Sequence, residues 1–160
     1  MIRNVNIIDS QQICDIYNHY IEHTDITFEE DPVTVVEMSE RIKKVTKDMP
    51  WIVYEEDGKI LGYAYASPWR VRAAYRFCAE TSLYVDINLS HRGVGTKLYK
   101  QLILELKDLG IHSVLGCLAM PNDKSQGLHE KLGFTKVAHF PEVGFKFGHW
   151  IDVGYWQLNL

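Results

Sequence analysis

Residues 83–119 constrain the fold most, because a strand, a glycine turn, a helix and a second strand follow one another there without a break. Apolar residues recur every three or four positions over residues 95–109, which predicts an amphipathic helix ended by Gly110. Residues 114–119 are almost uninterruptedly apolar, as in a strand buried on both faces. The helical stripe consists of Val94, Leu98, Leu102, Leu106 and Leu109. The order of strand, turn, helix and strand predicts an α/β fold.

Further strands are predicted on both sides of this segment, from β-branched and apolar runs bounded by turn residues. One strand pair flanks a turn at residues 56–58. Besides 114–119, the predicted strands span residues 2–7, 51–54, 59–67, 79–85, 134–140 and 150–158. Strands alternate with helices in the middle of the chain and pair directly at both ends, so the sheet is predicted to be mixed.

Three further helices are predicted, each from a capping residue followed by apolar residues at helical spacing. The first is capped by Asp9-Ser10, and the second begins at the capping box formed by Thr34 and Glu37. Pro50 is predicted to end the second helix. The third spans residues 123–132 and stops at Gly133.

The composition is that of an ordinary soluble globular chain. Its 160 residues fit a single domain, residues 1–160, and no apolar run approaches the roughly 20 residues that cross a bilayer. The N-terminus lacks the apolar core of a signal peptide. A net charge of −4 gives no general attraction to nucleic acid, so neither a membrane nor a nucleic-acid partner is predicted.

The cysteines and histidines predict no disulfide framework and no metal site. Cys14, Cys78 and Cys117 are odd in number and isolated, and free thiols are typical of a cytoplasmic protein. No pair among the seven histidines has metal-ligand spacing on one helix face. The tryptophans predicted to be sheet and core residues are Trp51, Trp150 and Trp156.

The turn Ser90-His91-Arg92-Gly93-Val94-Gly95 lies between a predicted strand and a predicted helix. A helix N-terminus presents unpaired N–H donors and a positive partial charge, which suit a phosphate or pyrophosphate. Gly93 and Gly95 remove Cβ atoms that would block a close approach, and Arg92 can add a charged contact. Neither GxGxxG nor a P-loop motif is present, and on this turn alone a purely structural role is equally open.

With its surroundings, this turn resembles the pyrophosphate motif of the Gcn5-related N-acetyltransferase superfamily, Gln/Arg-x-x-Gly-x-Gly/Ala. Ser90 departs from that motif at its first position, while Asn122 and Leu132-Gly133-Phe134 follow in the expected order. The resemblance extends over nearly the whole chain to the phosphinothricin acetyltransferase-like branch. The matching segments are residues 27–32, 50–51, 62–64, 72–75, 80–85, 128–134 and 146–152.

The resemblance implies a mixed, mostly antiparallel sheet of six to seven strands flanked by helices, with splayed central parallel strands. It implies acetyl-CoA as co-substrate, with the pyrophosphate on the main chain of residues 91–96. The residues that it places beside the cofactor are Leu83, Tyr84, Val85, His91, Arg92, Gly93, Val94, Gly95, Thr96, Asn122 and Ser125. Asn122 fits equally well as the N-cap of the helix that follows it.

The resemblance also implies the groups that handle protons and the acceptor. Glu80 is its candidate base, and a carboxylate partly buried in an apolar strand would have a raised pKa. His129 stands where many members carry a tyrosine acid, and it fits equally as a packed core histidine. The acceptor pocket is expected to include Phe28, Glu29, Arg72, Ala73, Ala74, Tyr75 and Glu80, with Arg72 pairing with an acceptor carboxylate.

These expectations predict direct acetyl transfer to the α-amino group of a small-molecule amine of the phosphinothricin, methionine sulfone or methionine sulfoximine type. Two alternatives remain open on the sequence. One is an acetyltransferase for a protein or peptide, and the other is a non-catalytic CoA-binding module. The branch commonly forms dimers, so a homodimer is expected.

Overall fold

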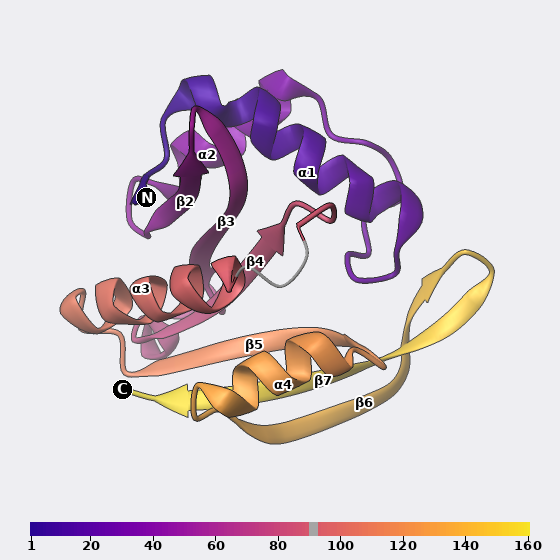
Figure 1. The fold of residues 1–160 in the computed structure, drawn as a ribbon. Helices are drawn as coiled ribbons and strands as arrows, with labels where there is room; N and C mark the ends of the chain where they lie inside the picture. Colours follow the sequence, from indigo (N-terminus) through magenta and orange to yellow (C-terminus); the bar gives the residue numbers. More distant parts are fainter. Residues whose placement is uncertain (90–92) are drawn as a thin grey trace.

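A computed structural model describes residues 1–89 and 93–160, and these form one seven-stranded sheet in the order β1-β2-β3-β4-β5-β7-β6 (Figure 1). The strands are β1 (Ile2–Asn4), β2 (Trp51–Glu56), β3 (Lys59–Pro68), β4 (Cys78–Val85), β5 (Ser113–Met120), β6 (Thr135–Lys146) and β7 (His149–Asn159). Of the strand pairs in the described part of the chain, β4 and β5 are parallel and the rest are antiparallel. The predicted mixed, mostly antiparallel sheet is confirmed.

Helices cover both faces of this sheet. They are α1 (Ser10–His23), α2 (Val35–Val45), α3 (Val94–Asp108) and α4 (Asp123–Lys131). Tyr84 of β4 packs with α1 and α2, whereas its neighbours Leu83 and Val85 pack with α3. Because side chains alternate between the faces of a strand, α1 and α2 cover one face and α3 the other. No helix within residues 1–89 and 93–160 is long and apolar enough to span a membrane.

The ladder between β4 and β5 is short, and this opens the sheet at its centre. It joins Cys78–Thr81 of β4 to residues 113–116 of β5, and the two strands then diverge (Figure 1). Over the same length β4 remains paired with β3 as far as Val85. The predicted splayed parallel strands are therefore confirmed, and within residues 1–89 and 93–160 one edge of β4 has no neighbouring strand beyond Thr81.

The predicted helix starts and stops are mostly confirmed. The Thr34 hydroxyl accepts a bond from the N–H of Glu37 at 3.2 Å, which caps α2. Gly110 follows α3 with a φ of +77°, and the N–H of Ile111 bonds the Leu106 carbonyl at 3.0 Å. These bonds close the last turn of α3, a conformation that glycine adopts without strain.

Local polar contacts overturn the predictions near the N-terminus. The strand predicted for residues 2–7 ends at Asn4, because the Asn6 side chain accepts from the N–H of Ile8 and starts a 3-10 turn. The Asp9 carboxylate does not cap α1; it accepts bonds from the Asn6 N–H and the Arg3 guanidinium. The competing partners therefore shorten the strand and move the capping role to Asn6.

Three further predictions are wrong in detail. The second helix ends at Val45, before Pro50 can interrupt it. Leu109, which is predicted to lie on the buried stripe, follows the last helical residue and is 57% exposed. Trp150 is 61% exposed because it lies near the tip of the β6–β7 hairpin, whereas Trp51 and Trp156 are buried as predicted.

Candidate functional site

A cleft of about 220 Å³ lies where β4 and β5 diverge. Its walls come from the two strands, α4 and its N-cap, the connection between α1 and α2, and one residue each of α3 and β7. The residues of these walls are Ile26, Thr27, Phe28, Glu80, Thr81, Ser82, Leu83, Tyr84, Tyr99, Cys117, Leu118, Ala119, Asn122, Ser125, His129 and Val153. The cleft thus joins candidate cofactor residues to candidate catalytic residues.

The free edge of β4 lines this cleft with main-chain groups. The N–H of Asp86 bonds the Leu61 carbonyl of β3 at 2.9 Å, so alternation turns the N–H groups of Val85 and Leu83 away from β3. They face the gap between β4 and β5. The Val85 carbonyl accepts a bond from the Tyr20 hydroxyl at 2.7 Å. The Leu83 N–H therefore points into the cleft and the Val85 N–H into the gap beside it, where the resemblance predicts the acetyl-pantetheine arm.

Glu80 lies on β4 beside the last residues that pair with β5, on the sheet face that α1 and α2 cover. Its side chain is half-buried, and burial raises the pKa of the Glu80 carboxyl above its ordinary value of 4.5. The predicted partial burial and raised pKa are confirmed. A carboxylate with a raised pKa is a better proton acceptor near neutral pH, which is what a general base needs.

His129 lies in the opposite wall of the cleft and is held on both ring nitrogens. Its Nδ1 lies 2.7 Å from the Ser125 carbonyl, and its Nε2 lies 2.8 Å from the Tyr99 hydroxyl. A carbonyl can only accept, so Nδ1 carries the proton of the neutral ring and Nε2 accepts from Tyr99. The Tyr99 hydroxyl is in turn 2.6 Å from that of Thr81. This geometry favours the packed-histidine alternative, and the acid role of His129 stays a prediction.

We expect His129 to be neutral at pH 7, with its proton on Nδ1 and a titration midpoint below 6.5. Burial lowers the pKa of His129, because the charged ring is poorly solvated in the wall of the cleft. Nitrogen-15 NMR of histidine-labelled protein, with His129→Asn to assign the signal, measures both properties. A proton on Nε2 in the neutral ring, or a midpoint above 6.5, would contradict the expectation.

The first turn of α3 lies against the end of β4. Gly93 precedes this helix with a φ of +69°, a conformation that favours glycine. A Cβ atom on Gly95 would lie 3.4 Å from the Leu83 side chain and 3.6 Å from that of Val85. Val94 is buried, and Thr96 lies in the same turn. Two residues of the predicted cradle, His91 and Arg92, lie outside the described residues, as does Ser90 before them.

Asn122 and Ser125 both line the cleft at the beginning of α4. The Asn122 side chain accepts a bond from the N–H of Ser125 at 3.1 Å, so Asn122 is the N-cap of this helix. The capping alternative is confirmed. Contact of either side chain with the cofactor stays a prediction.

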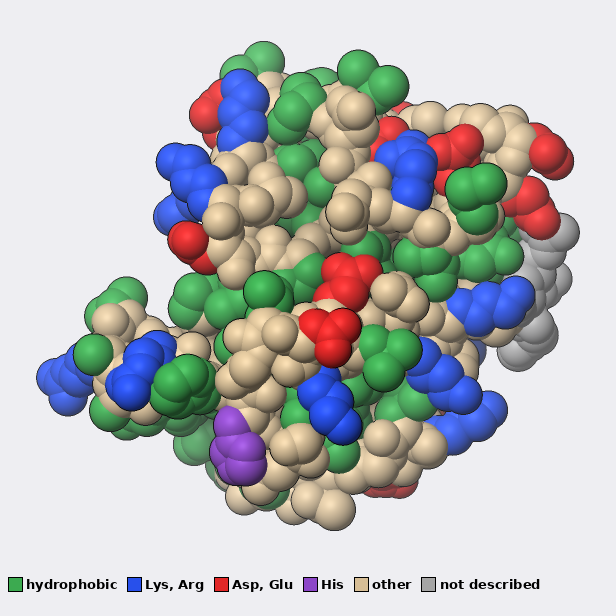
Figure 2. Space-filling model, turned by 90° about the vertical axis from the view of Figure 1, so that its left-hand side faces the viewer, with side chains coloured by type: hydrophobic (Ala, Val, Ile, Leu, Met, Phe, Trp, Pro, Cys, Tyr) green, Lys and Arg blue, Asp and Glu red, His purple; other side chains and the backbone are tan. Residues whose placement is uncertain are grey.

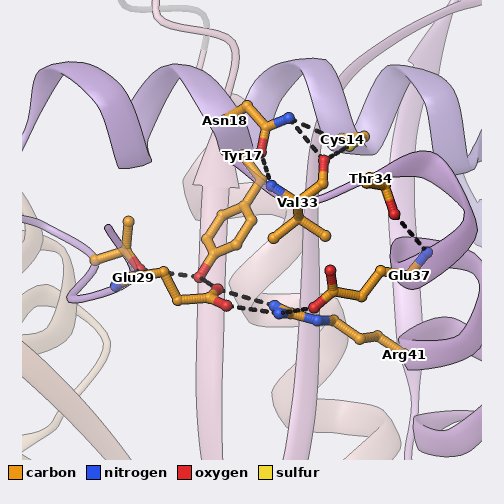
Figure 3. A network of polar contacts seen from close by, with 9 residues as sticks. Cys14, Tyr17, Asn18, Glu29, Val33, Thr34, Glu37 and Arg41 are labelled. Carbon is orange, nitrogen blue, oxygen red and sulfur yellow. Dashed lines mark hydrogen bonds and ion pairs between the residues drawn. The ribbon is translucent and has the colours of Figure 1, made fainter. Parts of the chain in front are cut away.

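The predicted acceptor residues are divided among three places. Phe28 lines the cleft, but Glu29 binds Arg41 through bonds of 2.8 and 2.5 Å and also accepts from Tyr17 (Figure 3). The Arg41 guanidinium lowers the pKa of Glu29. Glu29 thus anchors the connection between α1 and α2 rather than lining the cleft.

The segment from Arg72 to Tyr75 does not reach the cleft within this chain. Ala73–Tyr75 form a single 3-10 turn in the exposed connection between β3 and β4. Arg72 and Tyr75 line a separate depression together with Arg70 and Val71. The structure therefore does not bring this segment together with Glu80.

Sequence reasoning missed several cleft residues. Tyr99 and Thr81 line the cleft, with their hydroxyls 2.6 Å apart, and Cys117 lines it from β5. Tyr99 lies next to Leu98 of the apolar stripe, so its helical position was visible but its hydroxyl's partners on other elements were not. A tyrosine on the buried side of a predicted helix indicates that its hydroxyl has a partner inside the protein, and this was the sequence feature that pointed to Tyr99.

The described residues show neither a metal cluster nor a single-sign charge field on the face viewed in Figure 2. Among the side chains of residues 1–89 and 93–160, no group of three or more His, Cys, Asp or Glu is placed to hold a metal ion. Figure 2 shows Lys and Arg side chains mixed with Asp, Glu and hydrophobic ones, and a small lobe that stands away from the body.

Comparison with known proteins places this fold and cleft in a family. The family model for the acetyltransferase (GNAT) domain matches residues 2–154. A phosphinothricin N-acetyltransferase of Streptomyces viridochromogenes is 38% identical over 158 residues, which cover 99% of this chain and 86% of that protein. An L-methionine sulfoximine/L-methionine sulfone acetyltransferase of Salmonella typhimurium is 35% identical over 160 residues, covering 99% and 94%.

A solved structure shares the fold over the whole chain. The structure of yncA from Salmonella typhimurium with its cofactor acetyl-CoA superposes with a TM-score of 0.97 at 34% identity. The alignment covers 100% of this chain and 93% of that one. The matched family model, the curated relatives and the shared fold together show that this chain is an acetyltransferase of the GNAT family.

Proposed function

We propose that this enzyme transfers the acetyl group of acetyl-CoA to the α-amino group of a small amino-acid-like acceptor. Phosphinothricin and methionine sulfone or sulfoximine are the leading candidates, since curated relatives are named for them. The observation that carries the proposal is the half-buried Glu80 in a small cleft between the free edge of β4 and Phe28. A cleft of about 220 Å³ has room for a small acceptor.

The residues present fit acetyl-CoA. A Cβ atom on Gly93 would meet none of the described residues within 4 Å, which leaves the start of α3 open to a pyrophosphate, and the N–H groups of Leu83 and Val85 face the gap in the sheet. We propose that the main chain from His91 to Thr96, with Tyr84, Val94, Asn122 and Ser125 nearby, holds the cofactor. When bound, acetyl-CoA supplies an acetyl group activated as a thioester.

The chain's own groups can then promote the transfer. Glu80 accepts the proton of the attacking amine, directly or through one water molecule. A main-chain N–H of Leu83 or Val85 polarises the acetyl carbonyl, a contact worth about 3 kcal/mol at comparable sites. Burial raises the pKa of the Cys117 thiol, which keeps it protonated near neutral pH. Direct attack by the amine is therefore favoured over a covalent acetyl-cysteine.

A panel of acceptors tests this proposal. We expect release of CoA with phosphinothricin, methionine sulfone or methionine sulfoximine, and little or none with peptides that carry free N-termini or lysines. Thiol release and mass spectrometry of the product measure the two properties. Turnover of peptides alone would overturn the small-acceptor proposal, and binding of CoA without any turnover would favour the non-catalytic alternative.

We also infer the setting in which the enzyme works. Three free cysteines are consistent with the reducing cytoplasm. Phe145, Phe147 and Trp150 are 52–61% exposed on the β6–β7 hairpin, which supports a homodimer. All seven strands of the described part share one sheet, which supports a single domain over residues 1–160.

A further inference from the structure

The acceptor side of the cleft is formed by a loop that contacts the end of the β6–β7 hairpin. This acceptor loop, residues 24–33, connects α1 to α2 and contributes Ile26, Thr27 and Phe28 to the cleft. In Figure 1 it descends from the end of α1 toward the β6–β7 hairpin. The loop and the hairpin are more than 100 residues apart in the sequence, so contacts between them decide where the loop lies.

Lys146 of β6 makes the first of these contacts. Its side chain is 1% exposed, and its Nζ donates to the carbonyls of Thr24 and Thr27 at 2.8 Å each. The ammonium also lies 4.9 Å from the centre of the Phe147 ring. Burial lowers the pKa of Lys146, while the carboxylates of Asp25, Glu30 and Glu29 oppose that shift. A buried cation held mainly by two loop carbonyls fixes the backbone on both sides of Ile26.

Gly144 of β6 makes the second contact. Because it has no side chain, the Phe28 ring can lie against its backbone. A Cβ atom at this position would lie 2.5 Å from Cε2 and 2.6 Å from Cζ of Phe28. The Phe28 ring therefore rests directly on the strand backbone. β6 reaches this position through an irregularity between Phe140 and Gly144, which the Asp152 carboxylate holds by accepting from the N–H of Glu142 at 2.9 Å.

We propose that Gly144 and Lys146 determine which acceptors fit the cleft. Lys146 fixes the backbone of the acceptor loop, and Gly144 provides the space that lets the Phe28 ring lie against β6, where it forms part of the cleft wall without filling the cleft. This inference rests on the proposed function, because it concerns the small acceptor assumed there. Both residues act through the loop and are positioning residues.

Gly144→Ala tests the space beneath Phe28. The added methyl group displaces the ring toward the cleft, because β6 blocks the other direction. With glycine, alanine and methionine sulfone as acceptors of increasing size, we expect kcat/KM for the largest to fall about 10-fold or more relative to the smallest. The KM for acetyl-CoA should not change. Gly127→Ala is the matched control, because a Cβ atom there meets nothing within 4 Å.

Lys146→Met tests the hold on the loop without any ligand. Hydrogen exchange of the main-chain amides in residues 24–33 should become at least 10-fold faster, because two carbonyl contacts are lost. Lys136→Met, which removes an exposed lysine from the same strand, should leave that exchange unchanged. If Lys146→Met fails to fold, the acceptor profile of Gly144→Ala alone decides whether the contacts of the acceptor loop with β6 determine which acceptors fit.

The outcomes separate this inference from the proposed function. An unchanged acceptor profile in Gly144→Ala, in an enzyme whose wild type acetylates the panel, overturns the inference and leaves the proposed function standing. Unchanged loop exchange in a folded Lys146→Met overturns the role of Lys146. A wild type that acetylates no small acceptor refutes the proposed function, while the exchange experiment still decides whether Lys146 holds the loop.

Discussion

Replacing Glu80 with glutamine is expected to lower kcat/KM for acetyl transfer by about 100-fold, the usual contribution of a positioned general base. Glutamine keeps the size of the side chain but cannot accept the proton of the amine. In the wild type, kcat/KM should fall as the pH drops through the pKa of Glu80, which burial places above 4.5. Initial rates across pH should show that this limb is missing in Glu80→Gln, whereas an unchanged rate and profile would rule Glu80 out.

The stability of the same variant is the control for a merely structural effect. The pKa of Glu80 is higher in the folded chain than in the unfolded chain, so the folded state binds more protons between the two values. Stability therefore decreases as the pH rises through this interval, and the ionised carboxylate is the unfavourable form. Glu80→Gln removes that charge, so the unfolding temperature at pH 7 should be equal to or above that of the wild type. A large fall would assign the lost activity to misfolding.

The central part of the fold could be predicted because local signals and the global pattern agree there. The stripe through Leu98 and Leu102 has the helical period, and Gly110 ends the helix as its backbone conformation requires. The run at 114–119 reads as a buried strand and is one. Where polar side chains had several possible partners, as Asp9 did, the sequence pattern could not choose between them.

The candidate site could be predicted only where its residues are close in sequence. Glu80 and Leu83 share one strand, so their relation to the glycine turn followed from the order of elements. The partner of Glu29, Arg41, lies on the next helix, so the sequence gives no sign that the Glu29 carboxylate is bound there, and a contact of Glu29 with the acceptor stays a prediction. Lys146 carries no local sign of its role, since its two partners lie more than 115 residues earlier in the chain.

Gly116 is a second residue whose long-range contact cannot be predicted from the local sequence, where it is only a small residue in an apolar strand. Its Cα faces the His129 ring, and a Cβ atom there would lie 2.1 Å from Nε2 and 2.5 Å from Cδ2. The ring cannot retreat, because Tyr99 and Phe134 lie edge-on to it at 5.0 and 5.1 Å. The absent side chain therefore determines where His129 lies in the wall of the cleft.

Gly116→Ala is accordingly expected to lower the free energy of unfolding by about 2–4 kcal/mol. Overpacking a close-packed interior costs about 1–3 kcal/mol, and the broken bond between His129 and Tyr99 adds about 1 kcal/mol. For a chain of this size the melting temperature should fall by roughly 5–15 °C. Differential scanning calorimetry measures both quantities.

The comparison with Gly127→Ala makes this prediction specific to position 116. The chemical change is the same, but Gly127 lies within α4 with open space around its Cα, and alanine favours a helix over glycine by about 1 kcal/mol. Gly127→Ala should therefore leave the melting temperature unchanged or raise it. Equal melting temperatures for the two variants would mean that the His129 ring can move aside. In that case Tyr99 and Ser125 would not fix its position, and the neutral Nδ1–H form would lose its structural basis.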